Sequence, residues 1–234
     1  MLAAMLPDSL PLPHGAAPIL WRRSARARRI SLRIEPRQGS LVVTLPTRAS
    51  AAAAKAALVK HQVWIAERLS ALPRPIALGP GAAIPIDGRP HRIVHRPDRR
   101  GTAWLEGEEV HVAGDAAFIA RRVNDWLRLR ARRQLGQIAT DKAQAAGLDA
   151  RRIVVKDTSS RWGSCTANGT LMFSWRLVMA PLPVQDYVVG HEVAHLRHMN
   201  HGADFWALTD ALTPHRPYAS TWLLEHGPSL LRVG

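Results

Sequence analysis

Two histidines four residues apart, with a glutamate directly after the first, constrain this chain more than any other feature. His191, Glu192 and His195 form the pattern His-Glu-x-x-His, and His201 follows six residues later. On a helix, residues four apart lie on one face, so both imidazoles can hold one metal ion from the same side. The glutamate then lies beside the metal and can accept a proton from a metal-bound water. The pattern predicts the centre of a zinc-dependent hydrolase.

The residues around the motif favour a largely buried helix. Pro181 and Pro183 mark its start, because proline is tolerated in the first turn of a helix. Apolar side chains then recur at helical spacing up to and through the motif. Histidines buried in a helix without a metal are the alternative, and the adjacent glutamate makes that alternative weaker.

Two histidines compete for the third ligand position. His198 shares the helix face of the first two ligands, but a straight helix would carry it past the metal. Asn200 and Gly202 both tolerate a left-handed turn, which would end the helix and return the chain towards the metal. His201 lies between them and would then reach the metal from a second direction, as tetrahedral coordination requires. We therefore predict His201 as the third ligand and a supporting role for His198.

Composition bounds the function only loosely. A chain of 234 residues, 47% of them hydrophobic, suits one large or two small domains. The 32 basic and 18 acidic residues give a formal charge of +14. Nearly all of the basic residues are arginine, a bias that a GC-rich bacterial genome also produces, so the charge permits an anionic partner without requiring one.

Cysteine content and hydropathy favour a cytoplasmic location. The single Cys165 excludes an internal disulfide, which suits a reducing compartment. Residues 1–18 lack the basic start and continuous apolar core of a signal peptide. No apolar run approaches the roughly 18 residues of a membrane helix, so we expect no membrane partner.

The order of the predicted elements indicates an α+β fold. Residues 1–20 are expected to be a flexible tail, 21–114 a β-rich region with one helix, and 115–234 a zincin-like catalytic domain. The β-hairpin-rich N-terminal half would pack on this helical, metal-binding C-terminal domain. Alternating apolar residues predict strands at 29–34, 40–45, 83–86, 91–95, 103–105 and 109–112, and helical periodicity predicts a helix at 50–72. In the second half we expect strands at 152–155 and 169–173 and helices at 115–146, 175–180, 201–212 and 217–231.

The long helix predicted at 115–146 carries many arginines. Its apolar stripe includes Val123, Leu127 and Leu135. A solvated face is the favoured interpretation of the arginines, because charge runs are usually solvated, and a basic wall facing a substrate is the alternative. The arginines concerned are Arg121, Arg122, Arg128, Arg132 and Arg133.

The segment 159–165, with the sequence SSRWGSC, is the second unusual run. A loop of this composition can place Arg161 and backbone N–H groups near a developing oxyanion. A tight structural corner, with Trp162 packed and Gly163 needed for its backbone angles, explains the run equally well. Cys165 is not expected to be a nucleophile, because the metal site already accounts for hydrolysis. Tyr218, His215 and His226 are further candidates for oxyanion stabilisation, with packing roles favoured for each.

Several motifs of the second half resemble the YgjP-like metallopeptidase-domain family, which is related to SprT-like and WLM zincins. They are RWGSC at 161–165, WRL at 175–177, HEVAHLRHMNH at 191–201 and FW at 205–206. Segments 28–33 and 41–46 fit the family layout more weakly. The resemblance implies a zincin-like α+β catalytic domain, with His191, His195 and His201 as metal ligands and Glu192 as general base.

Together these patterns favour a cytoplasmic zinc-dependent metallopeptidase that acts on a peptide or protein, with Zn²⁺ as cofactor. Glu192 and Arg161 are the predicted catalytic residues. One alternative is a metal-dependent hydrolase of nucleotide phosphoanhydrides, because metal-water chemistry also serves phosphoryl centres and arginines suit a polyphosphate. Another is a nucleic-acid-associated protein or protease. The sequence leaves the oligomeric state open.

Overall fold

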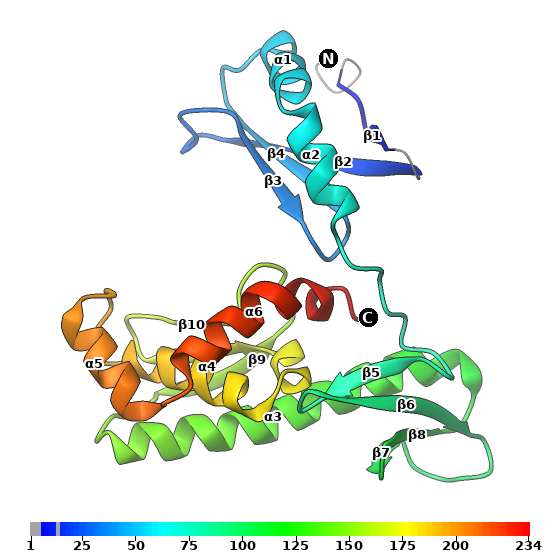
Figure 1. Cartoon of the computed structure of the whole chain (residues 1–234), viewed down its shortest axis with the longest axis vertical. Helices are drawn as coiled ribbons and strands as arrows, with labels where there is room; N and C mark the ends of the chain where they lie inside the picture. Colours follow the sequence, from blue (N-terminus) through cyan, green and yellow to red (C-terminus); the bar gives the residue numbers. More distant parts are fainter. Residues whose placement is uncertain (1–5, 13–14) are drawn as a thin grey trace. The chain divides into compact units, whose positions relative to one another are not determined.

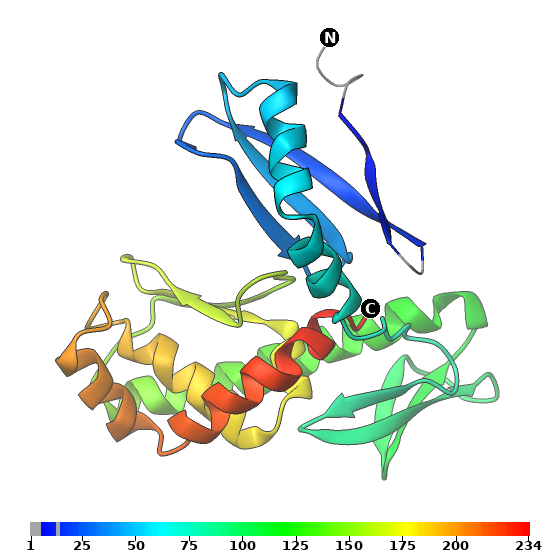
Figure 2. The ribbon, with the colours of Figure 1, turned by 45° about the horizontal axis from the view of Figure 1, so that its top comes forward.

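The computed structural model describes residues 6–12 and 15–234, which form two compact units, Met1–Arg74 and Pro75–Gly234 (Figures 1 and 2). Both units combine helices with small sheets, so the predicted α+β class is confirmed. No helix in the described part of the chain is both long and apolar enough to span a bilayer.

The first unit is a four-stranded sheet with a helical segment packed on it. Its strand order is β1-β2-β4-β3, with β2 parallel to β4 and the predicted hairpin of β3 and β4 antiparallel. The helix predicted at 50–72 is broken at His61, which separates α1 from α2, and the Ser50 side chain caps α1 by accepting from the Ala53 amide at 3.1 Å. The elements are β1 (Ser9–Leu12), β2 (Gly15–Ser24), β3 (Ser31–Glu35), β4 (Ser40–Pro46), α1 (Ala51–Lys60) and α2 (Gln62–Ser70).

The N-terminal segment differs from the flexible tail predicted for residues 1–20. Its described part forms β1 and the first half of β2. Ala17 and Ile19 are buried with Leu41 and Val43 of the neighbouring strand, and this shared core holds the segment in the sheet. Residues 1–5 and 13–14 lie outside the described residues.

The second unit begins with a four-stranded sheet of order β5-β6-β8-β7. Asp87 and Gly88 form the predicted hairpin turn between β5 and β6, both with positive φ (51° and 81°), which is the backbone geometry of a two-residue hairpin loop. Strands β6 and β8 run parallel. The bounds are β5 (Ala83–Ile86), β6 (Arg89–Arg96), β7 (Ala103–Glu106) and β8 (Glu109–Ala113).

The division of the chain at Arg74 and Pro75 differs from the boundary predicted at residue 115. The physical reason is a shared core. Ile84, Ile93 and Val112 of this sheet belong to the same buried cluster as Val123 and Leu127 of the long helix that follows. A sheet that buries its apolar face against a helix belongs to the same packed unit as that helix.

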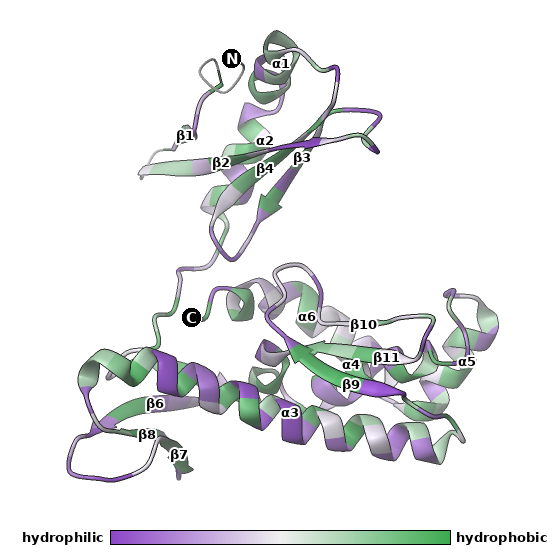
Figure 3. Cartoon of the chain, turned by 180° about the vertical axis from the view of Figure 1, so that it is seen from behind, coloured by the Kyte–Doolittle hydropathy of each residue, from purple (hydrophilic) through white to green (hydrophobic). Residues whose placement is uncertain are grey.

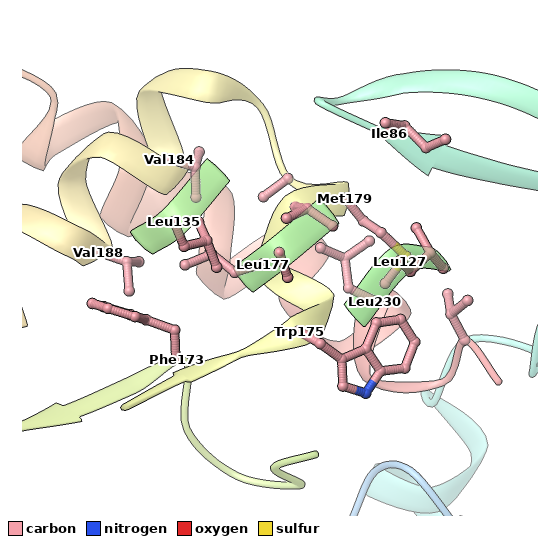
Figure 4. Close-up of a cluster of buried hydrophobic side chains, with 14 of the residues drawn as sticks. Ile86, Leu127, Leu135, Phe173, Trp175, Leu177, Met179, Val184, Val188 and Leu230 are labelled. Carbon is pink, nitrogen blue, oxygen red and sulfur yellow. The ribbon is translucent and has the colours of Figure 1, made fainter. Parts of the chain in front are cut away.

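The long helix α3 (Ile119–Ala145) is the central packing element of the second unit. It follows a short 3₁₀ turn, η2 (Ala116–Phe118), which Asp115 caps by accepting from the Ala117 amide at 2.8 Å. Its apolar stripe is fully buried at Val123, Leu127 and Leu135, as the periodicity predicted, while hydrophilic residues occupy other sides of the helix (Figure 3). Leu127 and Leu135 pack in one cluster with residues of η3 and α4 (Figure 4).

A small sheet, a 3₁₀ helix and three α-helices complete the second unit. The predicted strands β9 (Arg152–Lys156) and β11 (Thr170–Ser174) pair in parallel, and β10 (Gly163–Cys165), which was not predicted, pairs antiparallel with β11 and forms the edge of the sheet. The predicted helices then follow as η3 (Trp175–Met179), α4 (Leu182–Ala194), α5 (Ala203–Leu212) and α6 (Arg216–Leu231).

Candidate metal centre

Three imidazoles converge at the end of α4. His191 lies in the last turn of α4, His195 is its C-terminal cap, and His201 lies in the segment before α5. Their candidate ligand atoms all lie within 4.8 Å of one another. The Nε2 atoms of His191 and His201 are 3.2 Å apart. Two nitrogens bound to one zinc at 2.0–2.1 Å with tetrahedral geometry are about 3.3 Å apart, so this pair fits a shared metal ion.

The helix ends earlier than the sequence suggested, which changes the role of His198. The predicted left-handed turn at Asn200 or Gly202 was wrong: Gly202 has φ −74°, and Asn200 is not among the described residues with positive φ. Instead α4 ends at Ala194, so His198 is no longer on the helix, and its imidazole is not part of the histidine cluster.

His198 contributes through its backbone. The Nδ1 atom of His195 lies 2.9 Å from the His198 carbonyl oxygen, which can only accept. Nδ1 therefore carries the proton and donates it, and Nε2 keeps a free lone pair for a metal. Most metal-binding histidines are oriented in this way, by a hydrogen bond from the ring nitrogen that does not bind the metal.

Aromatic side chains from α5 enclose the three imidazoles. The ring of Phe205 is fully buried, and its centroid lies 4.9, 4.5 and 4.6 Å from those of His191, His195 and His201. Trp206 lies beside His191 and His201, at 5.9 and 5.6 Å. Helical spacing predicted Phe205 as an inward-facing residue of the helix at 201–212, and the family resemblance included both residues, but spacing alone does not distinguish them from core residues.

The electrostatics of the cluster favour neutral imidazoles. Burial, with smaller contributions from the two neighbouring histidines, lowers the pKa of His191 to about 4. Burial also lowers the pKa of His195, against the opposite effect of its hydrogen bond to His198. Both rings are therefore neutral at pH 7 and available as ligands. The buried Nδ1 of His191 has no hydrogen-bond partner among the residues that the structure describes.

Glu192 is buried next to the cluster. Burial raises the pKa of its carboxyl to about 7, and the nearby positive charge of Arg161 opposes this rise. The side chain also lies against β10, since a Cβ atom built on Gly163 would be 2.6 Å from Glu192 Oε1. A carboxyl with a pKa near neutrality is suited to accept and return a proton at that pH. The structure thus brings together the predicted Glu192, Arg161 and three histidines.

Cys165 lies on β10 close to this carboxyl. Burial first, and the charge of Glu192 second, raise the pKa of its thiol to about 11. The thiol is therefore protonated at neutral pH and a poor nucleophile, in keeping with its expected lack of a catalytic role.

The other candidates for oxyanion stabilisation lie at or on α6, outside the metal-binding group. His215 occupies the N-cap position of α6 without a capping hydrogen bond from its side chain, and Tyr218 is half exposed. His226 packs against Trp222, with ring centroids 4.9 Å apart.

A buried ion network supports the loop that leads into β10. Arg176 is fully buried, pairs with Asp157 and donates to the Val233 carbonyl at 3.0 Å. Asp157 also accepts from Arg128 at 3.0 Å. Further along this loop, the Thr158 hydroxyl donates to the Arg161 carbonyl at 2.7 Å. Sequence reasoning missed this network, because its partners are far apart in the chain.

Comparison with known proteins decides the family. The sequence-family model of the YgjP-like metallopeptidase domain matches residues 28–226 of the chain. The chain belongs to this family. Among solved structures, it is similar to the metallopeptidase zymogen abylysin of Pyrococcus abyssi, with 14% identity and a TM-score of 0.36, over 39% of this chain and 93% of that one. No curated protein matches the chain.

Membership of the YgjP-like family supports a metal-dependent hydrolase of the peptidase type, and with it a peptide or protein substrate. The histidine cluster is in keeping with a metal cofactor. The alternatives of a nucleotide substrate or a nucleic-acid partner receive no support from these comparisons.

Proposed function

We propose that this protein is a zinc-dependent metallopeptidase with His191, His195 and His201 as metal ligands and Glu192 as general base. The observation that carries the proposal is the convergence of three imidazoles, with 3.2 Å between the Nε2 atoms of His191 and His201. Three protein ligands leave a tetrahedral site one open position, which is the arrangement of catalytic rather than structural zinc.

In the proposed mechanism, residues around the cluster transfer the proton and stabilise the developing negative charge. When bound, zinc lowers the pKa of a coordinated water towards ~7 and polarises the carbonyl of the scissile bond. The Glu192 carboxylate accepts the proton of the attacking water and returns it to the leaving amine nitrogen. Arg161, whose charge already acts on Glu192, stabilises the negative charge that develops on the carbonyl oxygen.

The edge strand β10 supports a peptide as the substrate. It pairs with β11 on one side and forms the edge of its sheet, while Gly163 at its start contacts Glu192. An extended peptide can add to such an edge as a further strand, held by its main-chain hydrogen bonds. A peptide bound in this way would pass close to the general base.

The test combines metal content with hydrolysis of a quenched fluorescent peptide library. We expect Glu192→Gln to keep its zinc and to lose about 10²-fold or more of the turnover. Glu225→Gln is the matched control, because Glu225 is an exposed residue of α6. A Glu192→Gln variant with the activity of the wild type would contradict the proposal.

A further inference from the structure

A cavity of about 690 Å³ lies in the second unit, lined by α3 and by Thr102 and Ala103 at the start of β7. Its volume is within the range of ligand-binding sites in proteins. Its lining from α3 runs from Arg122 to Gln134, with Arg133 next to the last position and Trp126 and Leu129 between the two arginines. None of the residues that line it belongs to the metal centre. We call this cavity the α3–β7 groove.

The α3–β7 groove has an arginine towards each end of its α3 lining. Arg122 and Arg133 are eleven residues apart, which on a helix corresponds to about 16 Å. Between them Leu129 is 44% exposed, so the middle of the stripe is apolar and accessible. A compact ion with one acidic group would not reach both arginines, whereas an extended chain would.

The arginines of the groove are available to a ligand to different degrees. Arg133 is exposed and makes no hydrogen bond or ion pair with other described residues. Arg130, which also lines the groove, pairs with Asp87, but its buried Nε has no hydrogen-bond partner in the described part of the chain. A buried donor without a partner costs free energy, which an acceptor on a bound ligand would recover.

We propose that the α3–β7 groove binds an extended acidic peptide segment of a partner protein. In an extended chain, residues i, i+2 and i+4 point to one side and span about 14 Å. An acidic residue at i+4 would pair with the exposed Arg133, since guanidinium groups bind carboxylates with two parallel hydrogen bonds. An acidic residue at i would meet the positive charge of Arg122, whose Nη1 already donates to the Ala113 carbonyl. An apolar residue at i+2 would contact Trp126 and Leu129.

Two features favour a peptide over a nucleic acid in the groove. Asp125 also lines the groove, three residues from Arg122, and it would repel a chain with a negative charge at every unit more than a peptide with only two acidic residues. The adjacent β7 is an edge strand of its sheet, and edge strands offer backbone groups to an added peptide. This inference does not depend on the peptidase activity proposed for the metal centre.

Fluorescence anisotropy tests the proposal with a labelled pentapeptide, Glu-Ser-Leu-Ser-Glu. The full chain carrying Glu192→Gln is used, so that hydrolysis does not consume the probe. The same peptide with lysine in place of glutamate and a labelled decathymidylate are the comparison probes. We expect the acidic peptide to bind and the lysine peptide to show no binding.

Substitutions at two neighbouring residues of α3 separate binding in the groove from attraction to the general charge of the protein. Arg133→Glu is expected to weaken binding of the acidic peptide at least tenfold, and Arg133→Gln to weaken it to a smaller extent. Arg132→Glu makes the same charge change at an exposed position outside the groove and should change the affinity less than threefold. Thermal denaturation checks that all variants are folded.

Three results would overturn the proposal. The first is no binding of the acidic peptide to the wild-type groove. The second is an equal loss with Arg133→Glu and Arg132→Glu, which would mean non-specific attraction to the basic surface. The third is tighter binding of decathymidylate with the same dependence on Arg133, which would make the groove a nucleic-acid site.

Discussion

The side chain of Glu192 and the backbone of Gly163 lie in direct contact. A Cβ atom built on Gly163 would be 2.5 Å from Glu192 Cγ and 2.8 Å from its Cδ, distances that real Cβ atoms do not adopt. Gly163 is not among the glycines with positive φ, so space rather than backbone angle requires glycine here. The edge strand thereby fixes where the carboxyl of Glu192 lies.

Gly163→Ala is therefore expected to displace the general base without removing the metal. A misplacement of about 1 Å at a reacting group can cost on the order of 10²-fold in rate, and we expect a loss of 10- to 100-fold in turnover. Gly136→Ala is the control, because Gly136 lies in α3 with nothing within 4 Å of an added Cβ, and alanine there should keep activity. Normal turnover of Gly163→Ala would refute this account of the contact.

The two competing histidines should differ in their effect on metal binding. His201→Ala removes an imidazole of the cluster and is expected to weaken zinc binding at least tenfold. His198→Ala should retain zinc, because the hydrogen bond to His195 is accepted by the backbone carbonyl, which alanine also has. Elemental mass spectrometry of both variants beside the wild type measures this. Loss of zinc from His198→Ala alone would show that the ligand assignment is wrong.

Removing the buried charge of Glu192 should stabilise the metal-free protein at alkaline pH. The folded-state pKa of this carboxyl is raised from 4.5 to about 7, so the unfolded chain releases the proton at a lower pH than the folded chain. The free energy of unfolding therefore falls as the pH rises from about 4.5 to 7, and the penalty is fully present above pH 7.

Glu192→Gln lacks this penalty, so its free energy of unfolding should exceed that of the wild type by about 3 kcal/mol at pH 8, with no such gain at pH 4. His191, whose lowered pKa acts in the opposite direction, is present in both proteins and cancels. Thermal denaturation in the presence of a chelator at both pH values measures the difference. A gain of the same size at pH 4 would mean that the charge is not its cause.

The ion network around Arg176 should be important for stability. Asp157→Asn leaves the fully buried Arg176 without its carboxylate, and breaking a buried pair from one side costs about 3 kcal/mol. Asp98→Asn is the control, because Asp98 is 59% exposed and pairs with Arg96 at the surface, so its Tm should stay close to that of the wild type. Equal denaturation midpoints for the two variants would argue against a structural role of the network.

Local features of the chain could be predicted from the sequence with good accuracy. The helical spacing of Val123, Leu127 and Leu135 predicted the buried stripe of α3, and Asp87-Gly88 predicted its hairpin turn. Within the candidate site, the same local spacing predicted His191, Glu192 and His195 together, and they lie in the last turn of α4 and at its C-cap. These features depend on residues close in sequence, whose geometry the periodicity of a helix or the backbone preferences of a turn determine.

By itself, then, the sequence determined most of the helices and strands and the residues of the candidate metal centre, and the tertiary structure decided how they meet. The parallel pairing of β9 with β11, the contact of Gly163 with Glu192 and the pair of Arg176 with Asp157 all join separate segments. Such contacts leave no periodic pattern, because they depend on which buried surfaces fit together when the whole unit packs. His201 illustrates both the contribution of the sequence and that of the tertiary structure. Its residue type and spacing are visible in the sequence, but its approach to His191 follows from the early end of α4 and from the packing of Phe205.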